Sequence, residues 1–299
     1  METWLVTGAN GFLGANAGYF LADRCHSIAL TRSGLPANFA SAVHADLTDI
    51  SALGAAVRKA QPDVILHTAA MASHEACELD PHLAHQANAL ATQELALAAK
   101  EVGARFIYIS TDAVFDGKSG NYGEADQPNP FSVYGRTKLE GETLALASNP
   151  GALVIRTNFF GWSPSHTRSI LEFFVNALRS HQSVAGYTDF TVSSIYVSQL
   201  LQAIWGLNEL AAKGIVNVAA GEPLSKHDFG LAVADTFGLD PGLVRAELSP
   251  SQTGVSRRRN LSLNTEHLQT LLREPAPDTR AGLLLAKADE AAVLGSLSA

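Results

Sequence analysis

The chain of 299 residues has few cysteines, no long apolar run and no excess of basic residues. Cys25 and Cys77 are too few for a disulfide framework, and they fit a reducing cytoplasm. No apolar run approaches the ~20 residues of a membrane span, and the first residues lack a basic n-region, so we expect neither a membrane protein nor a signal peptide. The 29 acidic and 21 basic residues give a net charge of −8, which argues against a nucleic-acid partner.

Apolar residues make up 46% of the chain, enough for a large core. In the first half, short apolar runs alternate with stretches of helical spacing. Strands are expected at residues 4–7, 27–31, 64–68, 105–110 and 153–156, and helices at 14–23, 50–60, 83–102 and 134–147. Strands that are nearly continuously apolar are buried on both faces, as in a parallel sheet covered by helices. The order therefore predicts an α/β fold with a Rossmann-like, doubly wound parallel sheet.

The alternation changes after residue 156. A helix is expected at 170–179, an extended piece at 190–194, and short proline-punctuated elements beyond residue 221, whereas helix 197–208 and strand 214–219 still fit the sheet. We therefore expect a cofactor-binding domain at residues 1–160, on which 195–220 also packs. A smaller, interleaved C-terminal substrate-binding lobe is expected at 161–194 and 221–299, and the stretch 281–294 predicts a surface helix.

A glycine-rich turn follows the first expected strand and opens a helix. Its glycines permit a tight turn and bring the backbone close to a pyrophosphate at the positive end of the helix. The glycines alone also fit an ordinary strand-to-helix turn, but the strand, the helix and the position in the chain together predict dinucleotide binding. The turn residues expected at the cofactor are Gly8, Asn10, Gly11, Phe12, Leu13 and Gly14.

The residues after the second expected strand indicate which dinucleotide binds. An acidic residue there would hold the ribose 2′-hydroxyl of NAD, but the sequence has Arg32 and Ser33. Because a guanidinium forms two hydrogen bonds to a phosphate, this pair favours NADP(H) over NAD(H), with a solvated loop arginine as the alternative. Asp46 and Leu47, just past a third strand region, are expected near the adenine or in an exposed turn.

Tyr134 and Lys138 lie four residues apart at the start of an expected helix, so their side chains share one face. An ammonium beside a phenol favours the phenolate and lowers the pKa of the tyrosine, which makes Tyr134 a candidate general acid for carbonyl reduction. Alone, the pair also fits a surface contact. Residues 110–117, however, place hydroxyl groups at the C-terminal end of a strand, where open α/β sheets bind ligands.

The glycine turn, the segment Ser-Thr-Asp-x-Val-Phe-Asp-Gly and the motif Tyr-Gly-x-x-Lys-x-x-Gly-Glu resemble those of the extended short-chain dehydrogenase/reductases. Within these, the sequence is most similar to the dTDP-4-dehydrorhamnose reductase group. The resemblance runs from the glycine turn through residues 67–70, 110–117, 122–124, 130–142 and 156–157 to 190–200 and 259–263. It implies an NADP-dependent oxidoreductase that reduces the C4 ketone of a nucleotide-activated 4-keto-6-deoxy sugar, as in dTDP-rhamnose biosynthesis.

The resemblance also implies roles for single residues. NADPH delivers hydride, Tyr134 donates a proton to the ketone oxygen, Thr111 hydrogen-bonds that oxygen, and Lys138 holds the nicotinamide ribose. Asp112 and Ala113 are expected at the sugar, and Arg258 and Arg259 either clamp a substrate diphosphate or lie in a solvated loop. Positions expected beside the cofactor are Thr68, Ala69, Ala70 and Asn88, the last as a support for the neighbouring helix.

Other functions remain open. A nucleotide-sugar epimerase or dehydratase could use the same scaffold, but dehydratases have a glutamate where this chain has Ala113, and Arg32 argues against an epimerase that retains NAD. A non-catalytic, NADP-binding regulatory subunit is a third candidate, against which the intact catalytic set counts. Some members of the group dimerise, sometimes with magnesium, so a homodimer also stays open.

Four residues of types that bind metal ions lie close together in the sequence. Nothing in their spacing makes the side chains converge on one ion, so we predict no metal site there. His74, which follows the fourth strand, is instead placed at the mouth of the active site. These four residues are His74, Cys77, His82 and His85.

Overall fold

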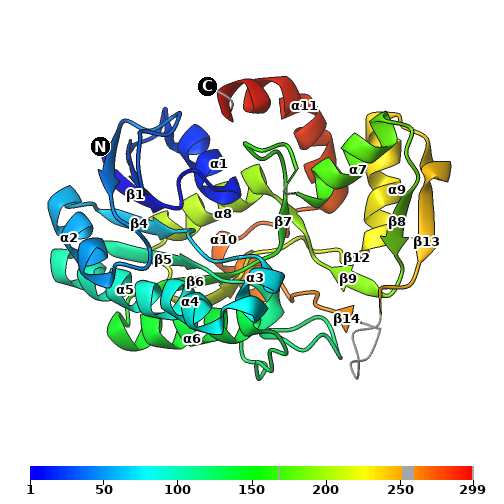
Figure 1. Cartoon of the computed structure of the whole chain (residues 1–299). Helices are drawn as coiled ribbons and strands as arrows, with labels where there is room; N and C mark the ends of the chain where they lie inside the picture. The colour runs from blue at the N-terminus through cyan, green and yellow to red at the C-terminus, as the bar shows by residue number, and fades with distance from the viewer. Residues whose placement is uncertain (168, 251–258, 298–299) are drawn as a thin grey trace.

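The computed structural model describes residues 1–167, 169–250 and 259–297 (Figure 1). Among these residues the central sheet has seven strands, all parallel, in the order β11–β6–β5–β4–β1–β2–β3. This order reverses direction beside β1, as in a doubly wound sheet, and confirms the predicted fold class. The strands are β1 (Thr3–Thr7), β2 (His26–Thr31), β3 (Ser41–His44), β4 (Val64–His67), β5 (Arg105–Ile109), β6 (Leu153–Arg156) and β11 (Gly214–Asn217).

Successive side chains of each strand enter two different cores, because neighbouring residues of a strand point to opposite faces. In β1, Trp4 and Val6 belong to one core and Leu5 to the other. The first core contains residues of α1 (Phe12–Leu21) and α8 (Val197–Glu209). The second contains residues of α2 (Ile50–Ala60), α5 (Ala91–Val102) and α6 (Val133–Ser148), which line the opposite face in Figure 1.

The long helix expected at 83–102 is divided into three parts. Asp80 caps the first part, α4 (Pro81–His85), by accepting a hydrogen bond from the Leu83 amide at 2.9 Å. A π-helical turn, η1 (Gln86–Leu90), then leads into α5. Such turns insert one residue into a helix and often occur at functional sites. The apolar periodicity of the sequence does not reveal the insertion, and Asn88 lies inside it.

The strands in the segments predicted to form the lobe are short, with two to four residues each. The structure has α7 at the predicted bounds, but the sequence did not predict the parallel pair β8–β13, which lies at one side of the lobe in Figure 1. Strand β9 lies between β12 and β14, and β7 pairs with β10. The bounds of all elements not yet given, inside and outside the lobe, are α3 (His74–Leu79), η2 (Asp112–Val114), β7 (Phe159–Phe160), α7 (Ile170–Arg179), β8 (Val184–Tyr187), β9 (Phe190–Val192), β10 (Ile195–Tyr196), β12 (Leu224–Ser225), α9 (Lys226–Phe237), η3 (Pro241–Leu243), β13 (Val244–Glu247), β14 (Arg259–Asn260), α10 (Glu266–Leu272) and α11 (Thr279–Leu297).

The last helix, α11, is only partly the predicted surface helix. It packs against α1 and α9 (Figure 1), with Leu283 and Ala286 fully buried. The Ala286 carbonyl accepts a hydrogen bond from Trp162 Nε1 at 2.7 Å. Leu284 is nevertheless 62% exposed, so hydrophobicity does not distinguish the two sides of this helix. Within the described ranges, no helix has the length and apolar character needed to cross a membrane.

Candidate active site

The glycine turn between β1 and α1 forms a cradle that side chains would fill. Gly8 has a φ of +67°, and its carbonyl accepts a hydrogen bond from the Gly11 amide at 2.8 Å. A Cβ on Gly14 would collide with the Gly8 carbonyl, and a Cβ on Gly8 would lie 2.9 Å from the Ala69 Cα. No side chain caps the first turn of α1, so its backbone N–H groups are available to an anion. The turn therefore fits the pyrophosphate of a dinucleotide.

The end of β2 is tied to this turn. Asn10 Nδ2 donates to Thr31 Oγ1 at 3.0 Å, and that hydroxyl donates to the Ser33 carbonyl at 3.2 Å. Arg32 is exposed beside them. Hydrogen bonds from Thr48, assisted by the charge of Arg32, lower the pKa of Asp46. Arg32 and Asp46 thus lie near each other at the edge where the adenosine end of a cofactor is expected.

The segment after β4 is fixed against the turn by Thr7. The Thr7 carbonyl accepts from Thr68 Oγ1 at 2.6 Å, and Thr7 Oγ1 accepts from the Ala69 amide at 3.1 Å. His67 is fully buried and bridges two hydroxyl groups, Thr7 Oγ1 at 2.7 Å and Thr92 Oγ1 at 3.0 Å. Burial, with a smaller effect from the charge of Lys138, holds the pKa of His67 well below its usual value. This neutral histidine joins β1 and β4 to α5 through the two hydroxyl groups.

The side chain of Asn88 links the segment after β4 to helix α6. Its Oδ1 accepts from the Met71 amide at 2.8 Å, and its Nδ2 donates to the Met71 carbonyl at 3.1 Å and to Thr137 Oγ1 at 3.0 Å. In the π-helical turn, the Asn88 carbonyl accepts from the hydroxyls of Thr92 and Tyr108. These bonds hold the segment after β4 to α6.

Tyr134 lies in the first turn of α6, where it meets the end of β5. Ser132 caps this helix by accepting from the Gly135 amide at 3.1 Å. Thr111 lies close enough to Tyr134 to affect its pKa, and the Tyr134 ring centroid lies 4.8 Å from that of His74. Burial raises the pKa of Tyr134, the neighbouring Thr111 hydroxyl lowers it, and the charge of Asp112 raises it further, so the net shift is upward. Tyr134 therefore carries its proton.

Lys138 does not act on Tyr134 as the sequence suggested. Its ammonium donates to the Ile109 carbonyl at 2.6 Å and lies 4.0 Å from the Tyr108 ring centroid. Burial lowers the pKa of Lys138 to about 7, against the opposing effect of Glu142. The expectation that Lys138 lowers the pKa of Tyr134 is wrong here, because burial outweighs any such effect on Tyr134.

Asp112 is buried at the start of η2 with only 4% of its surface exposed. Its Oδ1 accepts from Thr111 Oγ1 at 3.1 Å, and its Oδ2 accepts from Asn158 Nδ2 at 2.9 Å. Burial raises the pKa of Asp112 to about 6, although the bonds from Thr111 and Asn158 and the charge of Lys226 act in the opposite direction. Asp112 is thus a buried carboxyl group that changes charge near neutral pH.

Two cations of the lobe approach the same region. Arg259 Cζ lies 4.0 Å from the Phe131 ring centroid, and Lys226 Nζ lies 4.4 Å from that of Phe190. Burial and then the charges of Arg259 and Lys226 lower the pKa of His74, so both cations lie near His74. Within the described residues neither cation has an ion-pair partner. Arg258 lies outside the described residues.

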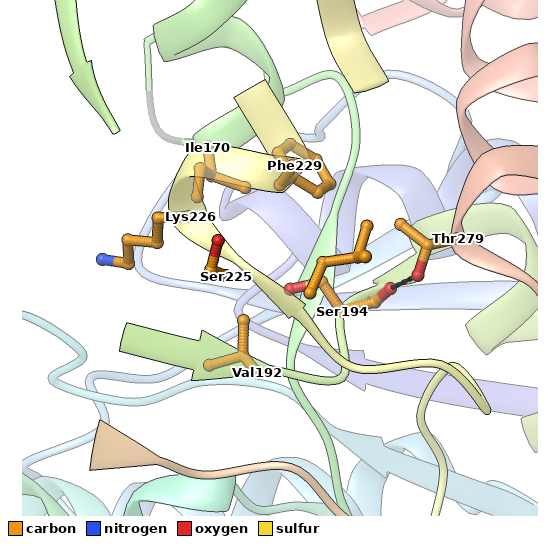
Figure 2. A pocket seen from close by; sticks show the side chains of 8 residues that line it. Ile170, Val192, Ser194, Ser225, Lys226, Phe229 and Thr279 are labelled. Carbon is orange, nitrogen blue, oxygen red and sulfur yellow. Dashed lines mark hydrogen bonds between the residues drawn. The ribbon is translucent and has the colours of Figure 1, made fainter. Parts of the chain in front are cut away.

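Lys226 also borders a small pocket of the lobe. Figure 2 shows its ammonium pointing away from Thr279, whose hydroxyl donates to the Ser194 carbonyl at 3.1 Å. The pocket is lined by apolar side chains together with Ser194, Ser225, Lys226 and Thr279. Its lining residues are Ile170, Val192, Ser194, Leu224, Ser225, Lys226, Phe229 and Thr279.

Comparison with known proteins decides the family. The model of the RmlD substrate binding domain matches residues 2–290. The chain belongs to this family. The match confirms the predicted resemblance to the extended short-chain dehydrogenase/reductases and, with it, the class of NAD(P)-dependent oxidoreductases.

The similar proteins include both enzymes and a subunit of another enzyme. The chain is 32% identical to a hypothetical dTDP-4-dehydrorhamnose reductase from Sulfolobus tokodaii, with a TM-score of 0.82 over 94% of this chain and 99% of that one. It is 29% identical to a probable low-salt glycan biosynthesis reductase of Haloferax volcanii, over 81% of this chain and 83% of the relative. It is also 31% identical to the methionine adenosyltransferase 2 subunit beta of Bos taurus, over 89% of this chain and 81% of the relative.

Behind the active site of this RmlD-family chain lies a buried ion pair. Arg156 and Glu142 side chains are each 2% exposed, with Arg156 Nη2 at 2.7 Å from Glu142 Oε2 and Nε at 3.0 Å from Oε1. Ser110 Oγ donates to the same Oε1 at 2.5 Å. The pair joins β6 to α6 directly behind Lys138.

Sequence reasoning placed Thr111, Tyr134 and Asp112 together but missed Asn158 and Lys226. Asn158 follows β6, so the general rule that ligands bind at the carboxyl ends of strands was the available signal. The sequence Ser-x-x-Asp from Ser225 signals a helix start at Lys226 but not its approach to Asp112. In the described residues no three metal-ligand side chains form a group able to hold an ion, and the Cys77 thiol donates to the Met71 carbonyl.

Proposed function

We propose that this protein is an NADPH-dependent reductase of a nucleotide-activated 4-keto-6-deoxy sugar. The observation that carries the proposal is the proximity of Tyr134 to Thr111 at the carboxyl end of β5. The glycine turn follows β1 at the same edge of the sheet. When bound, NADPH supplies the hydride. Tyr134 holds a proton at its phenol oxygen because burial raises its pKa, and it donates that proton to the ketone oxygen.

Lys138 has a binding role in this proposal. Its ammonium is anchored to the Ile109 carbonyl and retains further donors for the ribose hydroxyls of the nicotinamide. The cradle of Gly8 and Gly14 takes the pyrophosphate, and Arg32 with Ser33 takes the 2′-phosphate. Asp46, Leu47, Thr68, Ala69 and Ala70 complete the proposed cofactor site.

The charge of the lobe supports an anionic substrate. Arg259 and Lys226 are cations without ion-pair partners in the described part of the chain, and both lie near His74 at the mouth of the site. A guanidinium binds phosphate oxygens in pairs, and an ammonium binds them singly. A nucleoside diphosphate linked to the sugar supplies that negative charge, which supports a nucleotide sugar over a free ketose.

The test is NADPH oxidation followed at 340 nm with purified protein. We expect turnover with dTDP-4-keto-6-deoxy sugars, and kcat/KM lower by at least about 100-fold for the same sugar without its nucleotide, because remote binding energy lowers the barrier. Arg259→Ala should raise KM for the nucleotide sugar, whereas Arg245→Ala, an exposed arginine of β13, should not. Binding of NADPH without turnover of any nucleotide sugar would refute the reductase.

Replacement of Arg32 tests the choice of cofactor. We expect Arg32→Ala to raise KM for NADPH by about 10- to 100-fold, since charge-assisted hydrogen bonds contribute roughly 1.5–3 kcal/mol. KM for NADH should stay unchanged, because NADH lacks the 2′-phosphate. Arg24→Ala is the matched control, since the Arg24 guanidinium lies 4.0 Å from the Phe20 ring and away from the turn. Equal losses with both cofactors would show that Arg32 does not read the 2′-phosphate.

A second function is favoured by one observation. The relatives that are about 31% identical over most of the chain include methionine adenosyltransferase beta subunits, so a non-catalytic subunit is the alternative. Stable co-elution with a methionine adenosyltransferase catalytic subunit, without NADPH consumption, would select it. The meeting of Thr111, Tyr134 and Lys138 favours the enzyme, because binding alone does not need a proton donor. We also propose a cytoplasmic location, since Cys25 and Cys77 are free and buried.

A further inference from the structure

Several groups near Thr111 compete for the single proton of its hydroxyl. A hydroxyl has one proton to donate and two lone pairs that accept. One lone pair accepts from the Ala113 amide at 3.1 Å, and the proton is donated to Asp112 Oδ1 at 3.1 Å. The Tyr134 phenol also lies close enough for Thr111 to lower its pKa, which is the effect of a hydroxyl that donates toward the phenolate. In the arrangement that the structure shows, the Thr111 proton is donated to Asp112 instead, so none is left for the phenol or for a substrate oxygen.

The carboxyl group of Asp112 cannot turn away from Thr111. Ser194 Oγ donates to Asn158 Oδ1 at 2.6 Å, which directs the Asn158 amide nitrogen toward Asp112. The Asn158 carbonyl accepts from the Ile195 amide at 2.9 Å, so the backbone of Asn158 is held as well. Asp112 Oδ2 is therefore occupied by Asn158, and Oδ1 faces Thr111. Ser194 is itself fixed by Thr279 (Figure 2).

We propose that Asp112 is a positioning residue that sets the direction of the Thr111 hydroxyl and thereby controls proton delivery by Tyr134. When Asp112 is ionised, it takes the Thr111 proton, and the Tyr134 O–H points to Thr111. When Asp112 is neutral, its own proton is donated to Thr111. The Thr111 proton is then free to stabilise the ketone oxygen or the developing phenolate of Tyr134. This inference rests on the reductase function proposed above.

The surroundings of Asp112 and Tyr134 place the change in the charge of Asp112 near neutral pH. Lys226 faces Asp112 from α9, and Tyr134 faces it from α6. Cys77 and His74 of α3 lie against Tyr134. Burial dominates at Asp112 and sets its pKa to about 6. Because the neutral form is the productive one, activity should fall as the pH rises through that value.

The variant Asp112→Asn imitates the neutral carboxyl group. Asn158 Nδ2 needs an acceptor, so the new amide turns its oxygen to Asn158 and its nitrogen to Thr111, where it donates as the neutral acid does. We expect wild-type kcat/KM to fall about tenfold per pH unit above the midpoint, as for one essential proton. Asp112→Asn should be level from pH 5 to 8 and exceed the wild type at pH 8. Asp126→Asn, on an exposed loop, should keep the wild-type profile.

A second variant keeps the inference testable if Asp112→Asn does not fold. Asn158→Ala removes a hydrogen bond that favours the ionised carboxylate, so the midpoint of the activity loss should move to higher pH. An unchanged midpoint in Asn158→Ala, or the same alkaline loss in Asp112→Asn as in the wild type, would overturn the inference.

A measurement without substrate separates this inference from the proposed function. The carbon-13 signal of the Tyr134 Cζ, assigned by comparison with Tyr134→Phe, should shift with a midpoint near pH 6 in the wild type and stay level in Asp112→Asn. That result with no turnover of nucleotide sugars would refute the reductase alone. Absence of the shift in the wild type would refute the control of Tyr134 by Asp112, whatever the activity.

Discussion

Tyr134→Phe should lower kcat for ketone reduction by about 10²- to 10⁴-fold, the usual contribution of a positioned general acid. The phenol is the group in contact with Thr111 that holds a proton at neutral pH, because burial raises its pKa. Phenylalanine keeps the ring that packs 4.8 Å from the His74 ring, so the shape of the site is preserved. The loss should therefore appear in kcat, with KM for NADPH changed by less than about twofold.

The measurement is steady-state NADPH oxidation, with cofactor binding followed by fluorescence titration. Tyr19→Phe is the matched control, since Tyr19 lies on α1 with 40% of its surface exposed and should retain full activity. Retention of more than a tenth of the wild-type kcat in Tyr134→Phe would mean that another group donates the proton. Loss of NADPH binding together with activity would instead assign the phenol a role in holding the cofactor.

The first half of the fold could be predicted from the sequence because its signals are local. Each predicted strand is a short, mostly buried apolar run, whereas the bounds of the partly buried edge strand β3 were not predicted. The glycines after β1 permit a turn that Gly8 adopts at φ +67°. Tyr134 and Lys138 were found by a spacing of four, which puts both on one face of α6. Thr111 was found because it directly follows a strand of the parallel sheet.

The remaining features depend on contacts between distant segments. From the sequence we expected Lys138 to lower the pKa of Tyr134. Burial and the charge of Asp112, which come from distant segments, raise that pKa instead. Lys226 acts on Asp112 from the first residue of α9, more than a hundred residues along the chain, so only the tertiary fold brings the two charges near each other. The parallel pair β8–β13 consists of strands of four residues, too short for a periodic pattern to identify.

Breaking the buried ion pair behind the active site should have the largest effect on stability. Glu142→Ala leaves the Arg156 guanidinium buried, 2% exposed, without the carboxylate that accepts from its Nε and Nη2. It also deprives Ser110 Oγ of its acceptor. Removing one member of a buried pair costs about 3–5 kcal/mol, a large part of the 5–15 kcal/mol typical of a folded protein. We expect a loss of that size in urea denaturation.

Two comparisons separate the burial of charge from the loss of an ion pair as such. Glu101→Ala breaks an exposed ion pair, in which the Arg58 side chain is 48% exposed and the Glu101 side chain 59%. This change should lower the free energy of unfolding by less than about 1 kcal/mol. The double variant Glu142→Leu with Arg156→Met should recover most of the stability, because apolar residues of similar volume replace a buried pair at little cost. If Glu142→Ala lowers the free energy of unfolding no more than Glu101→Ala does, the prediction is wrong. The guanidinium of Arg156 would then reach water or another acceptor once Glu142 is gone, and loss of the buried carboxylate would not destabilise the fold.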